Sequence, residues 1–582
     1  MKHPWATSLV LGAGAALYAT LAVGSMRVKS ATFDEAAHLP AGYTYLKLRD
    51  YRLNPEHPPL IKTLAAMPLL LMNVQLRPDD EAWALRRQWE FGRRFLYRWN
   101  DADRLLFRGR LTIVALGVLL GVAVFFRAGR DWGLPGAALA LFLCVLNPDM
   151  LAHGQIVTTD MGAALFIFLS IVAFERLVDR ATWPRLVLTG LAVGAAVATK
   201  FSTLVLAPIL GALALLAVLS PDPMRRAWRQ EAAQDIEGRG PRLVHMAVLL
   251  AAMALIAVVV LWASYGFATS LSPDPSVDAA FDWGRVSGRN GVIDGAMTAA
   301  RRLHLLPEAY AFGFLRFFQH SEARPTFLLG RLSDRGFWYY FPVTFALKTP
   351  LALVALLILS MATLRHHAET IRTELFLWLP VLIYFAMACV LGLNIGHRHL
   401  LPIYPFLFVI AGRCATLAAI RFPGILSSAS VLILAAWYAL AAARVHPHYL
   451  AYFNELAGGP DNGYRSLVDS NLDWGQDLKG LKPWMDANGV SHVKLSYFGT
   501  ADPEYYRIPC ELLPGQMLPP PREVVREVKP GDVIAVSATN LQGVYLQPED
   551  RPLMERLRAL KPVATIGYSI RIYRADFAWP AP

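Results

Sequence analysis

Runs of about 20 apolar residues recur along the chain from Trp5 to Val445 and then stop. An α-helix of about that length crosses the roughly 30 Å of hydrocarbon in a lipid bilayer. Over the whole sequence 55% of the residues are apolar and only 17% are charged, which is outside the range of ordinary globular domains. The sequence therefore predicts an α-helical polytopic membrane protein.

We expect about 11 membrane-spanning helices within residues 1–445. The candidate spans are residues 5–26, 111–126, 135–146, 159–178, 186–198, 203–219, 243–267, 338–361, 375–393, 400–414 and 422–443. Residues 60–74 are apolar but too short for a span, and they contain Lys62 and Pro68, so we predict an interfacial or re-entrant helix there. Two large loops, residues 27–108 and 268–337, are expected on the outer face.

The net charge of +12 is carried largely by arginines in short loops between apolar runs. This placement is typical of membrane topology signals and gives no support for a nucleic-acid partner. If the N-terminus is cytoplasmic, the cytoplasmic loops hold Arg127, Arg130, Arg176, Arg180, Arg185, Arg225, Arg226, Arg229, Arg239, Arg242, Arg365, Arg372, Arg413 and Arg421. The bias predicts an odd number of spans and an extracytoplasmic C-terminus, although eight further arginines lie in the long first outer loop.

From residue 446 onward the composition is that of a soluble domain. Residues 493–497, 533–536 and 564–573 have the β-branched, alternating pattern of strands, and residues 478–487 have that of a helix. Cys510 is the only cysteine in this region, so an internal disulfide is excluded. We expect an extracytoplasmic α/β domain over residues 446–582.

Three ionisable residues, Asp34, Glu35 and His38, follow the first apolar run. Thr32 and Glu35 fit a helix-capping box, and Asp34 suits a helix N-terminus, so a purely structural interpretation is open. A zinc-protease motif is excluded, because Asp34 stands where His-Glu-x-x-His requires its first histidine.

A second cluster, Glu56 and His57, lies in a proline-rich turn before the short apolar stretch. A carboxylate beside an imidazole at a membrane surface can position a phosphate or a divalent metal ion. His38, Glu56 and His57 are the candidate ligands of a divalent metal ion, and the sequence leaves open whether a metal or other cofactor is needed.

Asp160, Lys200 and Arg398 each lie beside a predicted span. Asp160 can serve a helix N-terminus, and the two cations can be snorkelling anchors. The predicted topology nevertheless places all three on the same outer face as Asp34 and Glu56. Proton-accepting acids and phosphate-binding bases would then share one side of the membrane.

The soluble domain contains an aspartate-rich segment, residues 469–477. Asp473, Trp474 and Gln476 combine an aromatic ring with hydrogen-bonding groups, which suits contact with a sugar or an acceptor. An Asx-rich turn before the next helix is an equally simple explanation.

These residues resemble the motifs of the GT-C superfamily, the multi-span glycosyltransferases that use polyprenyl-phosphate sugars. The resemblance is to the bacterial branch related to protein O-mannosyltransferases and to lipid A aminoarabinose transferases. The matching elements, in order, are Asp34-Glu35, Glu56-His57-Pro58-Pro59-Leu60, Thr159-Asp160, Thr199-Lys200 and Arg398 with Leu400-Leu401-Pro402.

The resemblance implies that Asp34 is the general base or one partner of it, with Glu35 and Asp160 as further catalytic candidates. It also implies that the lipid phosphate is held by Glu56 and His57 together with Lys200 or Arg398. The aminoarabinose transferases carry a lysine where this chain has His57, which leaves the phosphate contacts and any metal open.

The implied function is transfer of a sugar from a polyprenyl-phosphate donor to a hydroxyl on a lipid, glycan or protein, at the outer face of a bacterial inner membrane. A base opposite a departing phosphate would invert the anomeric carbon. One alternative is a protein O-mannosyltransferase-type enzyme. Another is a lipid or glycan transporter or flippase, although the paired halves typical of transporters are not evident.

Overall fold

The computed structural model of the protein describes residues 4–222, 224–228, 234–288, 290–320, 324–362, 364, 371–419, 424–521 and 523–580. Three arginines used for the charge bias, Arg229, Arg365 and Arg421, lie outside the described residues, as do the first two residues of the last predicted span.

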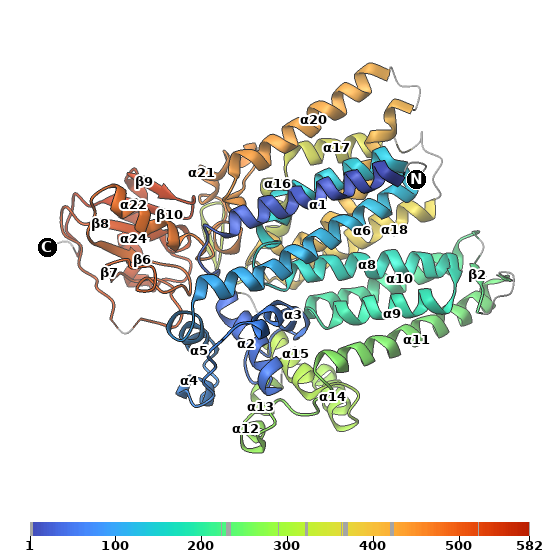
Figure 1. Cartoon of the computed structure of the whole chain (residues 1–582), viewed down its shortest axis with the longest axis horizontal. Coiled ribbons are helices and arrows are strands. Elements are labelled where there is room, and N and C mark those ends of the chain that lie inside the picture. The colour runs from blue at the N-terminus through green and yellow to red at the C-terminus, as the bar shows by residue number, and fades with distance from the viewer. Residues whose placement is uncertain are drawn as a thin grey trace.

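Long apolar helices lie side by side and form the body of the molecule (Figure 1). They are α1 (Pro4–Met26), α6 (Ala102–Val145), α8 (Asp160–Asp179), α9 (Trp183–Val197), α10 (Leu206–Leu219), α11 (Arg239–Ser264), α16 (Tyr340–Lys348), α17 (Leu351–Ala362), α18 (Ile371–Leu391), α19 (Tyr404–Gly412) and α20 (Gly424–Val445). In the described part of the chain, seven stretches are long and apolar enough to cross a membrane, or eight if α16 and α17, bent by 102°, form one broken span. The predicted multi-pass helical fold is confirmed.

The predicted spans at residues 111–126 and 135–146 form the two limbs of α6. Gly133 takes φ 65° and ψ −166° between them, a conformation that glycine adopts without steric cost. The limbs lie against each other, since a Cβ placed on Gly121 would lie 3.2 Å from Leu141 Cδ1. Two predicted spans therefore correspond to the single long helix α6. Two others correspond to the shorter apolar helices at Trp183–Val197 and Ala429–Val445.

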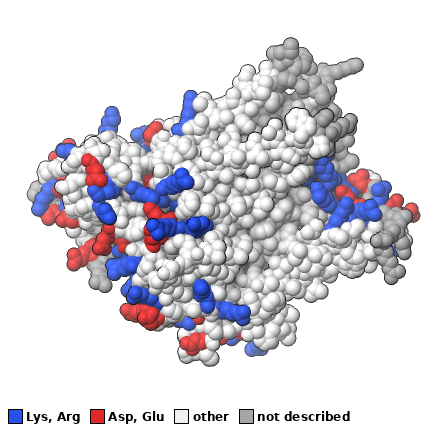
Figure 2. Space-filling model, viewed as in Figure 1, with Lys and Arg blue, Asp and Glu red and all other residues white. Residues whose placement is uncertain are grey.

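Charged side chains gather at the two ends of the helical body and leave an uncharged band between them (Figure 2). One end carries the C-terminal domain and the large loops; the other carries the N-terminus and the hairpin of β2 (Met224–Arg226) and β3 (Gln234–Ile236) (Figure 1). β2 also pairs with β1 (Arg180–Ala181), so two arginine-rich loops meet at this end. Such a band between charged ends is the pattern of a protein that spans a bilayer.

The two large loops fold into short helices at the end that carries the C-terminal domain. They are α2 (Glu35–Leu48), α3 (Leu60–Ala66), α4 (Glu81–Ala84), α5 (Gln88–Arg93), α12 (Pro275–Ala279), α13 (Trp283–Val286), α14 (Gly291–Arg302) and α15 (Glu308–His320), while α7 (Pro148–His153) precedes α8. The short apolar stretch is α3 followed by a 3₁₀ helix at Met67–Leu71, packed against α2. A Cβ on Gly42 would lie 2.0 Å from the Lys62 carbonyl oxygen, so the two helices touch through their backbones.

The C-terminal domain is the expected α/β domain, built on a five-stranded sheet in the order β7-β6-β8-β10-β9. The strands are β6 (Val493–Ser496), β7 (Cys510–Leu512), β8 (Val533–Ser537), β9 (Ala564–Ile566) and β10 (Ile570–Arg574), and the helices are α21 (Pro460–Gly463), α22 (Leu481–Ala487), α23 (Ala538–Leu541) and α24 (Arg551–Ala559). The single strand predicted at residues 564–573 is wrong. Gly567 and Tyr568 take left-handed conformations, with φ 58° and 67°, and turn the segment into the β9–β10 hairpin.

Backbone hydrogen bonds join this domain to the loop that follows α1. Ser30 N–H donates to the Gln476 carbonyl and Phe33 N–H donates to the Trp474 carbonyl, both at 2.9 Å. Lys29 Nζ donates to Asp477 Oδ1 at 2.5 Å. The aspartate-rich segment is therefore docked against the residues that lead into Asp34.

Candidate active site

Asp34 occupies the N-cap position of α2, but its side chain makes no capping hydrogen bond. Its carboxylate instead accepts from Arg398 Nη1 at 3.2 Å, and the side chain remains 20% exposed. The capping explanation for Asp34 is therefore not supported by the geometry. The carboxylate is reachable by solvent and is paired with a cation that lies 364 positions later in the sequence.

Asp160 is the first residue of α8 and is almost completely buried. Lys200 Nζ donates to its Oδ1 at 2.6 Å, and Arg398 Nη1 donates to its Oδ2 at 3.3 Å. One guanidinium nitrogen thus contacts both Asp34 and Asp160. The four groups come from four separate elements and form a network with two negative and two positive charges.

Trp474 supports Arg398 from the C-terminal domain, with the guanidinium carbon 4.2 Å from the ring centroid. A cation lying over an indole face is held in place by the ring quadrupole. The buried Nε of Arg398 has no hydrogen-bond partner among the described residues. One donor of this arginine thus remains available for an anionic ligand.

Glu35, the expected partner of Asp34, is fully buried and surrounded by donors. Its carboxylate accepts from Arg110 Nε (2.8 Å) and Nη2 (2.7 Å), from Thr32 N–H (2.8 Å) and from Val157 N–H (2.9 Å). Burial by itself raises the pKa of Glu35. The Arg110 guanidinium and these hydrogen bonds together have a larger, opposite effect, so the pKa lies below its usual value. A carboxylate with so many fixed donors is suited to holding the loop.

Glu56 and His57 lie beside this network, with partners of their own. Glu56 Oε1 accepts from Gln88 Nε2 at 2.7 Å, and Arg316 Nε lies 3.7 Å from Oε2. His57 packs edge-on against His38, with ring centroids 5.1 Å apart. Burial, and then the neighbouring cations, hold the pKa of His57 well below its usual range, so the ring is neutral.

The metal candidates His38, Glu56 and His57 do not converge. His38 Nδ1 lies 3.1 Å from the Val157 carbonyl, and Glu56 is bonded to Gln88. Across the described ranges, no group of three His, Cys, Asp or Glu side chains is arranged to hold a metal ion. We therefore assign no ligand set for a metal to these residues.

Of the three tail candidates, only Trp474 reaches the charged network. Asp473 is buried within its domain, where Oδ2 accepts from Thr539 N–H at 2.8 Å. Gln476 closes a local turn, accepting from Trp474 N–H and donating to the Leu472 carbonyl and to Asp477. The helical turn that follows, at Leu478–Gly480, has no side-chain cap from Asp477, so the helix-capping alternative is not supported by the geometry.

Sequence reasoning missed Lys62. Its buried amine donates to the Asn54 carbonyl (2.8 Å), the Tyr45 hydroxyl (2.9 Å) and the His57 carbonyl (2.7 Å). Burial lowers the pKa of Lys62 to about 7. A lysine inside an apolar stretch is costly unless its amine is hydrogen-bonded. Its position in the sequence could therefore have marked Lys62 as a residue with buried partners.

A second buried group, also missed, lies behind Arg398. Lys348 Nζ donates to the carbonyls of Leu450 and Asn471 and lies 3.6 Å from Asp149 Oδ1, while His397 Nε2 lies 3.7 Å from Asp149 Oδ2. His397 N–H also donates to Asn471 Oδ1 at 2.8 Å. These contacts fix the segment that carries Arg398 against the C-terminal domain.

Residues 16–270 match the model of the dolichyl-phosphate-mannose-protein mannosyltransferase family. The match covers the part of the chain that carries Asp34, Glu56, Asp160 and Lys200. No curated protein sequence matches.

Several solved structures are similar at low identity. ArnT from Cupriavidus metallidurans bound to undecaprenyl phosphate is 13% identical, with 99% of each chain covered and a TM-score of 0.45. The oligosaccharyltransferase AglB from Archaeoglobus fulgidus, with an inhibitory peptide and a dolichol-phosphate, is 13% identical over 100% of this chain and 75% of its own, at a TM-score of 0.45. The S. cerevisiae protein O-mannosyltransferase Pmt1-Pmt2 complex bound to the sugar donor is 16% identical. The match covers 46% of this chain and 33% of that chain, with a TM-score of 0.32. The family match covers less than half of the chain, so it shows that residues 16–270 are similar to this mannosyltransferase family, within a multi-pass helical fold.

Proposed function

We propose that the chain transfers a sugar from a polyprenyl-phosphate donor to an acceptor hydroxyl, and that Asp34, Asp160, Lys200 and Arg398 form the reaction centre. The observation that carries the proposal is the contact of one Arg398 nitrogen with both Asp34 and Asp160. It puts a partly exposed carboxylate next to two buried cations at one end of the bundle.

In the proposed reaction, the acceptor oxygen bonds to the anomeric carbon while the bond from that carbon to the phosphate oxygen breaks. Asp34 accepts the proton of the acceptor hydroxyl, since it is the more exposed of the two carboxylates. The polyprenyl phosphate leaves with the bonding electron pair. With base and leaving group on opposite sides of the sugar ring, the anomeric carbon inverts.

Lys200 and Arg398 stabilise the charge that grows on the leaving phosphate. Asp160 holds both cations in position through its two oxygens, so we assign it a positioning role and keep Asp34 as the base. Glu35 holds the Asp34 loop through Arg110. Glu56 Oε2 and His57 Nδ1 have no hydrogen-bond partner among the described residues, so Glu56 and His57 are the candidates for donor contacts at the edge of the site.

We place the site on the extracytoplasmic face of a bacterial inner membrane. The paired strands β1 and β2, which carry Arg180, Arg225 and Arg226, lie at the end opposite the C-terminal domain (Figure 1), and basic connections favour the cytoplasmic side. The transporter alternative is not favoured, because the matched family consists of transferases.

Donor binding tests the proposal. Undecaprenyl phosphate is titrated against the purified full-length chain and against Lys200→Gln and Arg398→Gln. Loss of a charge-assisted hydrogen bond to phosphate costs about 1.5 to 3 kcal/mol, so each variant should bind at least roughly tenfold more weakly. Lys47→Gln, which removes an exposed lysine near the end of α2, is the matched control and should bind normally. Unchanged affinity in folded Lys200→Gln and Arg398→Gln would overturn the assignment.

A further inference from the structure

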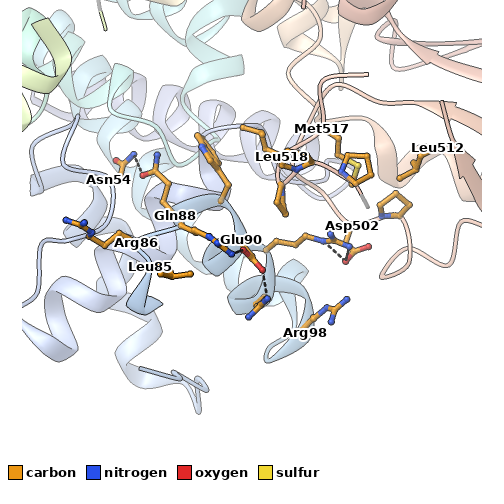
Figure 3. Close-up of a pocket in the computed structure, with 18 of the residues that line it drawn as sticks. Asn54, Leu85, Arg86, Gln88, Glu90, Arg98, Asp502, Leu512, Met517 and Leu518 are labelled. Carbon is orange, nitrogen blue, oxygen red and sulfur yellow. Dashed lines mark hydrogen bonds and ion pairs between the residues drawn. The ribbon is translucent and has the colours of Figure 1, made fainter. Parts of the chain in front are cut away.

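A large cavity lies between the first outer loop, the second outer loop and the C-terminal domain (Figure 3). Its volume is about 1790 Å³, whereas sites for drug-sized molecules measure about 300 to 1,000 Å³. A single monosaccharide would leave most of this space empty. The volume suits a chain of several sugar units or a ligand of similar size.

The cavity lining is basic. Nine arginines and six acidic residues line it, with no lysine or histidine. Arg98 and Arg507, one from each side, are exposed and form no ion pair with any other described residue. The guanidinium group matches phosphate and carboxylate oxygens with two parallel hydrogen bonds, so these arginines suit an anionic ligand.

Three of the lining arginines, Arg52, Arg86 and Arg316, lie close enough for their charges to interact. Burial, followed by the charges of Arg52 and Arg316, lowers the pKa of Arg86. Arg86 and Arg507 both have left-handed backbones, at φ 56° and 55°, which is uncommon for residues other than glycine. Unfavourable conformations and repelling charges concentrate where a ligand is bound.

Aromatic rings connect the cavity to the proposed base. Trp89 lines the cavity and packs edge-on against Phe33, with ring centroids 5.2 Å apart, and Phe33 directly precedes Asp34. Phe281 lines the other side under the guanidinium of Arg86. Flat apolar rings between arginines are complementary to sugar rings that carry anionic groups.

We infer that this cavity binds the acceptor and that the acceptor is an anionic saccharide, bearing phosphate or carboxylate groups. The inference rests on the proposed function, because it takes Asp34 as the base that the acceptor hydroxyl must reach. A bound saccharide would lie along Trp89 with its charges on the arginines.

Two probes test the charge and the source of the ligand. Phosphorylated maltoheptaose in solution and vesicles containing an anionic ganglioside are titrated against the full-length protein, with neutral maltoheptaose as comparison. At least one anionic probe should bind roughly tenfold or more tightly than the neutral one, and the arm that binds distinguishes a free glycan from a lipid-borne one. Equal binding of charged and neutral probes, or binding of neither anionic probe, would contradict the inference.

Variants locate the binding site. Arg98→Gln and Arg507→Gln should each lower the affinity for the anionic probe about three- to tenfold and make that affinity less dependent on salt concentration. Arg104→Gln is the matched control, since Arg104 is an exposed arginine nearby that does not line the cavity. Equal affinities in all three variants would place the probe elsewhere, and binding of a polyglutamate peptide as tight as that of the saccharide would reject a saccharide acceptor.

Undecaprenyl phosphate binding is measured on the same samples. Arg98→Gln and Arg507→Gln should retain the donor lipid, because neither arginine belongs to the Asp160 network. Failure of the wild-type protein to bind this lipid would count against the proposed function, whereas normal lipid binding without a preference for anionic saccharides would count against the cavity assignment alone.

Discussion

The guanidinium of Arg398 rests on the indole of Trp474, 4.2 Å from the ring centroid, so a membrane-domain loop is supported by a residue of the C-terminal domain. The same guanidinium reaches Asp34 and Asp160. The orientation of the central cation in the site therefore depends on a domain that lies outside the membrane body.

Replacing Trp474 should act through Arg398. Trp474→Leu removes a cation–π contact of about 0.5 to 2 kcal/mol, so donor affinity should fall roughly two- to thirtyfold. Trp474→Phe keeps an aromatic face and should restore most of the loss. Titration with undecaprenyl phosphate measures both, and equal loss in the two variants would indicate a packing role alone.

Asp34→Asn should abolish proton acceptance while leaving shape and donor binding intact. We expect transfer to fall by about a hundredfold or more, since an amide cannot act as the base. Asp160→Asn should instead lower the affinity for the donor lipid, because Lys200 and Arg398 lose the carboxylate that both of them contact. Single-turnover sugar transfer and lipid titration separate the two effects; near-normal transfer by Asp34→Asn would move the base elsewhere.

Glu35→Gln should destabilise the protein. Glutamine can still accept from Thr32, but Arg110 would stay buried without its counter-charge. Removing one partner of a buried ion pair costs about 3 to 5 kcal/mol. Thermal unfolding in detergent should show a lower Tm for Glu35→Gln than for Asp34→Asn, and a Tm equal to wild type would refute the structural assignment.

Asp473 should make stability depend on pH. Burial raises the pKa of Asp473 to about 8, against about 3.8 when unfolded. Between these values the folded protein holds one more proton than the unfolded chain, so stability falls as pH rises, by at most about 1.4 kcal/mol per pH unit. Asp473→Asn should flatten the dependence between pH 5 and pH 8. The measurement is the unfolding of both proteins across that range, and parallel curves would contradict the assignment.

The two termini should lie on opposite sides of the membrane, since they lie at opposite ends of the molecule (Figure 1). A reporter that is active only in the cytoplasm should work when fused before Met1 and be silent after Pro582. Strong activity of the C-terminal fusion would invert the proposed orientation and with it the extracytoplasmic site.

The helical membrane fold and the charged network could be predicted from the sequence, because burying Asp160 or Lys200 beside apolar spans is too costly without a partner. The gap between the two apolar runs at residues 111–126 and 135–146 also indicated where the chain reverses, and Gly133 lies in that gap. The different surroundings of Asp34 and Glu35 could not be predicted, because two adjacent acids look alike in the sequence and the partner of Glu35, Arg110, lies far along the chain. The contact of Trp474 with Arg398 joins distant segments through side-chain packing, which no local pattern encodes.

The docking of Trp474 and Gln476 onto the loop after α1 has a consequence for biosynthesis. The Ser30 hydroxyl donates a hydrogen bond to the carbonyl oxygen of Gly475, which follows 445 positions later in the sequence and is therefore made later. While the chain is being made and inserted, Arg398 is without its indole support and the Asp34 loop is without its backbone partners. The growing chain would therefore stay inactive until the domain that carries Gly475 and Trp474 has been translated and has folded against this loop.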